Sequence, residues 1–551
     1  MSAGFLGLTT SLSGLFANQR SLGIVSHNIA NANTEGYSRQ LMNTRAYQPQ
    51  VLPGGLGTLG VGVDVTAVKQ IRDHYLDYKM RVETSVKGEW DARASVLTEL
   101  EGIFNEPSDS SIAQLLDKYY ESLQSLQKNP ENLTARTLVR QNTIALSEGV
   151  RRISTMLKNL QADLNYQFQS AVGEVNSYAL QIAKMNESIY KAELEGATAN
   201  DLRDQRNVLV DKLSELVNVE YYEDEQNRFF VLVGRQQLVA HFRTDKLELV
   251  PREKKLNDDD DDQIMDVQWA TGNKLNVSSG KLKGLREVRD NLDGDKKGIP
   301  YYVNKLNEFI DTFTSTFNSI HENGYGLDGS TGNYMFTIRN MSTAEYKTYL
   351  LTKGLNGLPA TEATSAIMDG VLPTMSESEK QAQINSNIKK ILTNNPSYNN
   401  KAVRMIDGKY YVVDRMKASE VTVARDLEDL NKIGAATRLE DIPGDGTAIL
   451  RLIETRHNVR LYEWGAPEDF IKSLVSNLGV DAAESNRNAM NSKLLVNEYS
   501  TARDSIMGVS LDEEMANMIK FQTAYNANAR MVNVFDEMLD LIVNRLGTAG
   551  R

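Results

Sequence analysis

Apolar residues return every seven positions along the C-terminal end of this chain. The main row is Leu511, Met518, Tyr525, Val532, Leu539 and Leu546. A second row, three or four residues away from the first, is Met515, Phe521, Ala529, Phe535 and Ile542. Alternating steps of three and four place both rows on one narrow helical stripe, the pattern of a coiled-coil seam. A helix with such a stripe needs a partner, and this requirement constrains the fold more than any other feature.

A segment with the same period lies at the N-terminal end. Its main row is Leu8, Leu15, Leu22 and Ile29, with Phe5, Leu12 and Val25 beside it. Ser510 and Glu513 have the spacing of a capping box, which predicts that the C-terminal helix begins next to them. We therefore interpret the two termini as a shared coiled-coil stem, from which the rest of the chain departs and to which it returns. The alternative at this point is that each segment is an ordinary core helix.

Composition excludes several classes of protein. The chain has 551 residues, a net charge of −12 and no cysteine. The length allows roughly three or four domains, and the acidic balance argues against a nucleic-acid partner. No run of apolar residues is long enough to insert into a membrane. The absence of cysteine excludes disulfides and thiolate chemistry and suits a protein outside the cell. The N-terminus lacks a basic region followed by an apolar block, so we expect no cleaved secretory signal.

Periodicity predicts a mainly α fold with β insertions, an α+β multidomain protein. A helix near 71–104 should carry Val82, Val86 and Trp90 on its apolar face, and a long proline-free helix should span 131–191. Short β-branched segments predict a β-meander, and residues 402–413 have the pattern of a hairpin. The predicted domains are a stem at 1–50 with 508–551, a helical bundle at 51–216 with 281–324 and 465–507, a β-meander at 217–280, and an outer α+β or β-rich domain at 325–464.

Three patterns that could indicate chemistry are better explained by structure. Residues 55–60 match a dinucleotide-binding fingerprint, but a strand pattern follows them where that motif needs a helix. The five carboxylates at 258–262 lack the glycine and the closing glutamate of a calcium loop, so a solvated loop is expected. The five histidines have no metal-ligand spacing. We predict no enzyme activity, no cofactor and no metal site.

The segment 28–39 resembles the N-terminal signature of the bacterial flagellar axial family, which comprises rod, hook and hook-associated proteins. The matching positions are Asn28, Asn31, Asn33, Thr34, Gly36, Tyr37 and Arg39. Residues 508–546 resemble the C-terminal signature of the same family. Internal segments near 204–214, 279–285 and 299–324 are similar to the hook-associated protein 1 branch. The resemblance covers about 1–325 and 465–551, and leaves the fold of 325–446 unsupported.

The resemblance implies a structural component at the junction between the flagellar hook and filament, formed by self-assembly of terminal helices into an axial tube. The candidate assembly interface is Leu8, Leu12, Leu15, Leu22, Ile29, Leu511, Met518, Tyr525, Val532, Leu539 and Leu546. The implied partners are further copies of the chain, the hook protein, hook-associated protein 3, the flagellar export apparatus and an export chaperone. The implied location is the extracellular flagellum, reached without a cleaved signal peptide. The alternatives are the hook protein itself, hook-associated protein 3, or an axial protein whose outer insertion carries an enzyme or adhesin activity.

Overall fold

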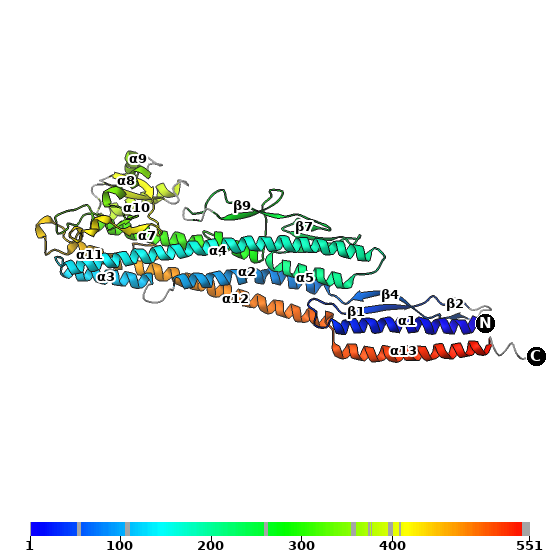
Figure 1. Ribbon diagram of the computed structural model, residues 1–551. Helices are drawn as coiled ribbons and strands as arrows, with labels where there is room; N and C mark the ends of the chain where they lie inside the picture. Colours follow the sequence, from blue (N-terminus) through cyan, green and yellow to red (C-terminus); the bar gives the residue numbers. More distant parts are fainter. Residues whose placement is uncertain are drawn as a thin grey trace, which may run out of the picture.

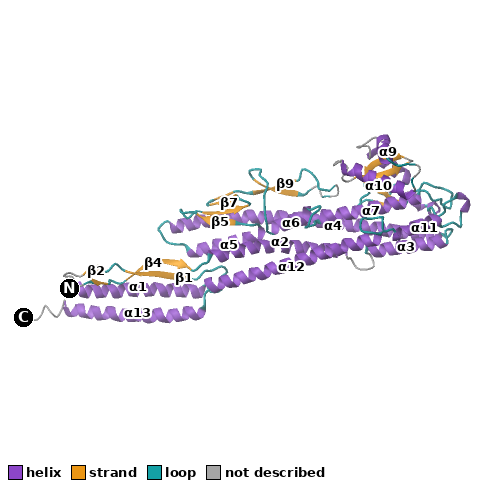
Figure 2. Ribbon diagram, turned by 180° about the vertical axis from the view of Figure 1, so that it is seen from behind, coloured by secondary structure: helices purple, strands orange, loops and turns teal. Residues whose placement is uncertain are grey.

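The protein is an elongated molecule with a slender stem at one end and a small lobe at the other (Figure 1). The computed structural model describes residues 2–51, 57–104, 111–257, 260, 263–353, 360–372, 375, 377–394, 401–406 and 409–542. A bundle of long helices connects the two ends, and small β-sheets lie along one of its sides (Figure 2). The architecture is mainly helical with β insertions, as the sequence predicts.

The stem contains both ends of the chain. Helix α1 (Ser2–Ala30) lies beside α13 (Leu511–Asp540), and strand β1 (Gln40–Ala46) pairs with β4 (Val63–Gln70) on α1. The short strands β2 (Gln50–Val51) and β3 (Thr58–Leu59) extend this ribbon. The Ser510 hydroxyl accepts a hydrogen bond from the Glu513 amide, so it caps α13 as the sequence predicts. The described residues 57–60 of the rejected dinucleotide motif lie in this ribbon, while 52–56 lie outside the description.

The bundle is built from helices far apart in the sequence. They are α2 (His74–Phe104), α3 (Ile112–Lys128), α4 (Leu133–Glu193), α5 (Asn200–Leu216), α6 (Lys281–Asp290), α7 (Ile299–His321), α11 (Thr447–Glu454) and α12 (Pro467–Met507). Helix α4 is the long helix expected over 131–191. Its start is set by Asn132, whose side chain accepts hydrogen bonds from the amides of Thr134 and Ala135. At the far end of the bundle, Phe313 and Phe317 of α7 pack on Tyr119 of α3.

The predicted apolar face of α2 is wrong in its first half. Val82 is 38% exposed, and the buried face of this part of the helix is polar instead. Its buried polar members are Asp77, Arg81, Ser85, Glu89 and Arg93, and Met80 and Gly88 are buried beside them. Neighbouring helices supply opposite charges: Arg81 pairs with Asp211 of α5 at 2.6 Å, and Glu89 pairs with Lys283 of α6 at 3.0 Å. Burial of a charged side chain is tolerated when it is paired in this way, and a sequence pattern cannot show which helix supplies the partner.

The β-meander covers one side of α4. Strands β5 (Glu220–Glu223), β6 (Phe229–Val233), β7 (Gln236–Ala240) and β8 (Arg243–Thr244) pair in sequence order, and β9 (Leu247–Pro251) pairs with β10 (Met265–Trp269). Asn176 of α4 exchanges two hydrogen bonds with the backbone of Leu247, at 2.8 and 2.9 Å. Of the acidic run at 258–262, only Asp260 is described. Its carboxylate accepts hydrogen bonds from Gln161 and from the amides of Leu256 and Asn257.

The range 325–464 divides into two parts in the structure. Strand β11 (Phe336–Ile338) pairs with β14 (Val421–Val423). Residues 342–419, here called the outer lobe, project beyond these strands and contain α8 (Thr343–Lys353), α9 (Ala360–Met368), α10 (Glu377–Asn394), β12 (Lys401–Ile406) and β13 (Lys409–Asp414). Strands β12 and β13 form the expected hairpin, whose turn at 407–408 lies outside the described residues.

Residues 425–464 pack against the bundle rather than in the outer lobe. Ile433, Ile449 and Leu452 are fully buried in the same core as the bundle helices. The buried guanidinium of Arg136 in α4 donates to the carbonyl oxygens of Leu430 and Ile433 at 3.1 and 2.7 Å. Apolar burial and these hydrogen bonds hold the segment to α4.

His321, at the end of α7, is buried and must be neutral to fit its surroundings. Its Nδ1 lies 2.7 Å from the carbonyl oxygen of Asn333, and its Nε2 accepts a hydrogen bond from the Gly434 amide at 2.9 Å. A ring that donates from Nδ1 and accepts at Nε2 carries one proton. Burial accordingly lowers the pKa of His321 to about 4.

We expect acid to destabilise the bundle through His321. Between about pH 6.5 and pH 4 the unfolded chain binds a proton at this residue and the folded chain does not. Stability is therefore lost as the pH falls, by about 1.4 kcal/mol per pH unit and about 3 kcal/mol in total. Urea unfolding at pH 7 and pH 5 measures this loss. His321→Gln should unfold more easily at pH 7 and show a smaller pH effect, whereas His74→Gln, at an exposed position, should keep the full effect.

Candidate assembly interface

The stem helices pack closely against each other at two glycines of α1. A Cβ atom added to Gly7 would lie 2.4 Å from the ring of Phe535, and one added to Gly14 would lie 2.9 Å from the Asn528 side chain. Both pairs follow the same antiparallel register. Glycine has no Cβ, so it allows the two helices to approach to this distance. The leucine row predicted as the seam lies one position after these glycines.

The predicted interface residues occupy different environments within one copy. Those that are half-buried are Leu8, Leu12, Leu15, Leu22, Ile29, Met518, Tyr525, Val532 and Leu539. Leu511 is 49% exposed, and Leu546 lies outside the described residues. The α1–α13 pair therefore covers its apolar rows only in part.

The polar segment 28–39 begins with Asn28, which is fully buried at the end of α1. Its Nδ2 donates to the Gln40 carbonyl oxygen at 3.0 Å and to Glu514 Oε2 at 3.1 Å. Its Oδ1 accepts from the Tyr37 hydroxyl at 2.7 Å and from the Gln40 amide at 3.0 Å. Each polar atom of this amide therefore has two partners, and a buried amide must be satisfied in this way.

Arg39 connects the segment after α1 to the start of α13. Its guanidinium contacts Glu514 and Glu513, each at 2.7 Å, and its amide donates to the Met507 carbonyl oxygen at 2.8 Å. The Glu514 side chain is 1% exposed. Paired charges with several hydrogen bonds are the arrangement that a buried carboxylate requires. We call Asn28, Tyr37, Arg39, Glu513 and Glu514 the terminal clamp, because they join the two ends of the chain.

A second polar cluster joins the stem to the bundle. The Ser38 amide and hydroxyl donate to Asp204 of α5 at 2.8 and 2.7 Å. Arg72 contacts Asp204 at 2.9 Å and Asp77 of α2 at 2.6 Å. Burial raises the pKa of Asp204, although the bonds from Ser38 and the charge of Arg72 oppose that shift. The cluster fixes the backbone of segment 38–40 against α2 and α5.

The remaining motif residues shape the turn between α1 and β1. Asn31 Nδ2 donates to the His27 carbonyl oxygen at 3.0 Å, and the Thr34 hydroxyl donates to Asn31 Oδ1 at 3.1 Å. Gly36 has a φ of 75°, and a Cβ there would lie 2.2 Å from Val208. This position therefore needs glycine for both conformation and space. Asn33 is exposed.

Sequence reasoning missed the residues that complete these clusters, namely Gly7, Gly14, Arg72, Asp77 and Glu514. One signal was present for the glycines, because Gly7, Gly14, Ser21 and Asn28 follow a seven-residue step of their own. No comparable signal identifies Glu514, one of three acidic residues in the first turn of α13.

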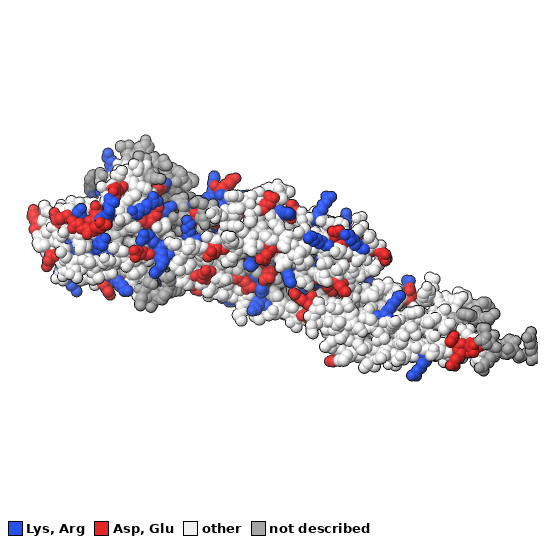
Figure 3. All heavy atoms as spheres, viewed as in Figure 1, with Lys and Arg blue, Asp and Glu red and all other residues white. Residues whose placement is uncertain are grey.

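The stem surface carries few charges compared with the bundle on the face shown in Figure 3. No helix within the described residues is both long enough and apolar enough to cross a membrane. In the described part of the chain, no group of three or more acidic or histidine side chains could hold a metal ion. The low charge and the incompletely covered apolar rows suit contacts between proteins.

We expect Asn28→Ala to loosen α13 from α1. The substitution leaves the Tyr37 hydroxyl and one Glu514 oxygen without a partner, at a cost of about 1–3 kcal/mol. Hydrogen exchange across 511–540 in the purified chain should become faster, while exchange across 133–193 should not change. Asn33→Ala is the matched control on the same turn and should have no effect. Unchanged protection of 511–540 in Asn28→Ala would contradict the role given to the clamp.

Comparison with known proteins agrees with this geometry. The family described as "Flagellar hook-associated protein FlgK helical domain" matches residues 97–336. "Flagella basal body rod protein" matches 8–37, and "Flagellar basal body rod FlgEFG protein C-terminal" matches 504–546. The last two matches contain every residue of the terminal clamp except Arg39.

Relatives match over the whole chain. The flagellar hook-associated protein 1 of Bacillus subtilis is 29% identical and covers 100% of both chains. That of Escherichia coli is 28% identical over 98% of this chain and 99% of its own. The solved structure of the flagellar hook junction protein FlgK from Burkholderia pseudomallei covers 79% of this chain and all of its own, with a TM-score of 0.55 and 14% identity, so it supports the fold. The chain is therefore similar over its whole length to flagellar hook-associated protein 1, a structural protein of the flagellum.

Proposed function

We propose that this chain is a structural subunit of the flagellar hook–filament junction, and that the stems of several copies assemble into an axial tube. The observation that carries the proposal is the incomplete burial of apolar side chains on both stem helices. The exposed members on α13 include Leu511, Met515, Ile519, Met531, Val534 and Met538. Such a surface is costly in water and is covered when copies associate.

The bundle and the outer lobe then face away from the axis. The described bundle has its own core, in which residues such as Leu157 and Phe313 are fully buried, so it does not need neighbours for stability. The described part of the stem has no comparable core. This contrast supports a division in which the stem makes the axial contacts and the remaining domains extend outward.

The partners of such a subunit follow from its place in the flagellum. The family supports assembly with hook and other flagellar proteins. More specifically, we propose contacts with the hook protein on one side and with hook-associated protein 3 on the other. We also propose that the chain reaches the outside of the cell through the flagellar export apparatus, bound beforehand by an export chaperone and without a cleaved signal peptide. The absence of cysteine suits this route.

We expect Leu22→Arg or Leu539→Arg to prevent filament attachment. Each substitution places a charge on an apolar row of the stem, where burial of an unpaired charge costs several kcal/mol. The chain should still be produced and exported, but cells should not swim. Leu22→Met and Leu539→Met conserve volume and should support normal motility. Normal filaments in either arginine variant, seen by electron microscopy, would show that the position lies outside the axial contacts.

We expect the outer lobe to be dispensable for attachment. Replacing the whole outer lobe, 342–419, with a short Gly-Ser linker keeps the β11–β14 pair and the 425–464 segment, which support the bundle. The linker joins neighbouring ends, because the Arg339 amide donates to the Glu420 carbonyl oxygen across the base of the lobe. Cells with this variant should assemble filaments. If the variant is exported and folded yet fails to attach filaments, the lobe takes part in the axial contacts.

A further inference from the structure

We propose that neighbouring copies pack head-to-tail through a specific contact, in which the first turns of α13 of one copy occupy a groove at the stem–bundle joint of the next. The inference rests on the proposed function and names the contact that the stem uses. The groove and its occupant are different surfaces of the same chain.

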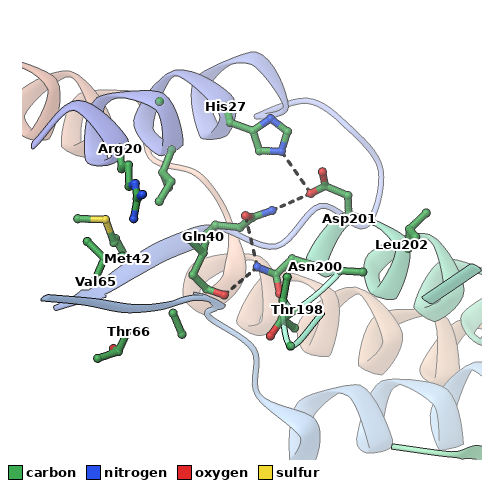
Figure 4. Close-up of a pocket in the computed structure, with 17 residues that line it drawn as sticks. Arg20, His27, Gln40, Met42, Val65, Thr66, Thr198, Asn200, Asp201 and Leu202 are labelled. Carbon is green, nitrogen blue, oxygen red and sulfur yellow. Dashed lines mark hydrogen bonds and ion pairs between the residues drawn. The ribbon is translucent and has the colours of Figure 1, made fainter. Parts of the chain in front are cut away.

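The groove lies between α1, the β1–β4 ribbon and the connection from α4 to α5 (Figure 4). Its volume is about 680 Å³. Ile24, Met42 and Val65 contribute apolar surface. Arg20 lies at one side, and at the other His27 Nε2 lies 3.2 Å from Asp201, which also accepts a hydrogen bond from Gln40 at 2.7 Å.

Gly23 leaves one wall of this groove open. A Cβ atom added to Gly23 would have no neighbour within 4 Å, and the glycine is exposed. Arg20 is the only lysine or arginine in α1. The groove therefore offers apolar surface, free space above a helix, the positive charge of Arg20 at one side and the carboxylate of Asp201 at the other. A segment that fits it should carry apolar side chains on one helical face and a carboxylate beside them.

The start of α13 has this composition. Leu511, Met515 and Ile519 are 49%, 50% and 66% exposed, and their steps of four place them on one face of the helix. Asp512 is exposed beside them and supplies the carboxylate opposite Arg20. The groove and this stripe lie at the same level of the molecule, because Asn28 of α1 and Glu514 of α13 are hydrogen-bonded there.

Helix geometry places the groove and the stripe on opposite sides of the α1–α13 pair. Each residue advances the helix by about 100°. In α13, the stripe of Leu511, Met515 and Ile519 lies about 110° around the helix axis from the side that contacts α1. In α1, the face with Arg20 and His27 lies about 110° around the helix axis from the side that contacts α13. Because the two helices are antiparallel, these turns lead to opposite sides. One copy cannot use both surfaces on itself, but a row of copies in one orientation pairs them at every contact.

The tip of the stem shows the same asymmetry. On the groove side, Met531, Val534 and Met538 of α13 are exposed. On the stripe side, Leu8 and Leu15 of α1 are half-buried. Copies packed in one direction therefore place the leucines of one stem against the methionines of the next. Such a heterologous contact, unlike a two-fold one, generates rings or helices.

Disulfide cross-linking tests the contact, because the natural chain has no cysteine. The double variant Gly23→Cys with Met515→Cys is expressed in cells that lack their own copy, hook–filament structures are isolated and oxidised, and the products are separated without reductant. A disulfide requires Cα atoms about 4.4–6.8 Å apart. We expect a ladder of dimers, trimers and larger species. Each single variant should remain monomeric, since a head-to-tail contact brings together two different positions.

If Gly23→Cys with Met515→Cys disturbs assembly, the double variant Ala67→Cys with Ile519→Cys tests the same contact. The control pair is Tyr166→Cys with Met515→Cys, in which Tyr166 is an exposed residue of α4 in the bundle, and it should not cross-link. Dimers from single variants would indicate a two-fold contact and overturn the proposal. So would the absence of cross-links in double variants that still attach filaments. Filament attachment reports separately on the proposed function, which fails if the unmodified chain does not restore it.

Discussion

The burial of one carboxylate, Glu514, determines how the two ends of this chain meet. Asn28, at the end of α1, and Arg39, in the segment after α1, donate hydrogen bonds to its two oxygens. Removing one partner of a buried charge pair typically costs about 3–5 kcal/mol. The contact is also directional, because the amide and the guanidinium can both donate to the carboxylate in only one position of α13 relative to α1. Apolar packing alone could slide by a helical turn, whereas this hydrogen-bonded pair fixes the register that Gly7 and Gly14 then follow.

The molecule thus uses polar contacts for geometry and leaves apolar contacts for association. At the joint, Ser38, Arg72, Asp77 and Asp204 orient the stem on the bundle. Asp211 of α5 continues this cluster between Arg81 and Arg503; burial raises its pKa, but the two arginines outweigh burial and hold the pKa below its ordinary value. The stem carries few charges on the face shown in Figure 3, and part of its surface is apolar, with Met515, Ile519 and Met538 exposed. Because polar contacts set the orientation of the stem on the bundle, every copy can present the same partly apolar stem surface to its neighbour.

The sequence predicted the elements with strong periodicity and missed the contacts between distant residues. The long helix at 133–193, the hairpin at 401–414 and the pairing of the termini follow from local patterns and from the two heptad rows. The buried face of α2 could not be predicted, because Arg81 and Glu89 are buried only through charges on α5 and α6. The close packing of α13 against Gly7 was not predicted, because the leucine row beside this glycine is the stronger sequence pattern. The sequence predicts 425–464 as part of one outer domain at 325–464, because the contacts of this segment with α4 involve backbone carbonyl oxygens that have no sequence signal.

A head-to-tail contact has no intrinsic end, so the shape of the subunit must limit the assembly. The bundle is visibly broader than the helix pair of the stem (Figure 1). Copies that pack through adjacent stems therefore have room for their bundles only if these extend outward from a common axis. The angle between consecutive stems then depends on the groove and on the joint, whose backbone is fixed by the terminal clamp and by Asp204. A change at the joint would alter the number of copies per turn before it altered the affinity between two stems, because the apolar surfaces of the stem would be unchanged.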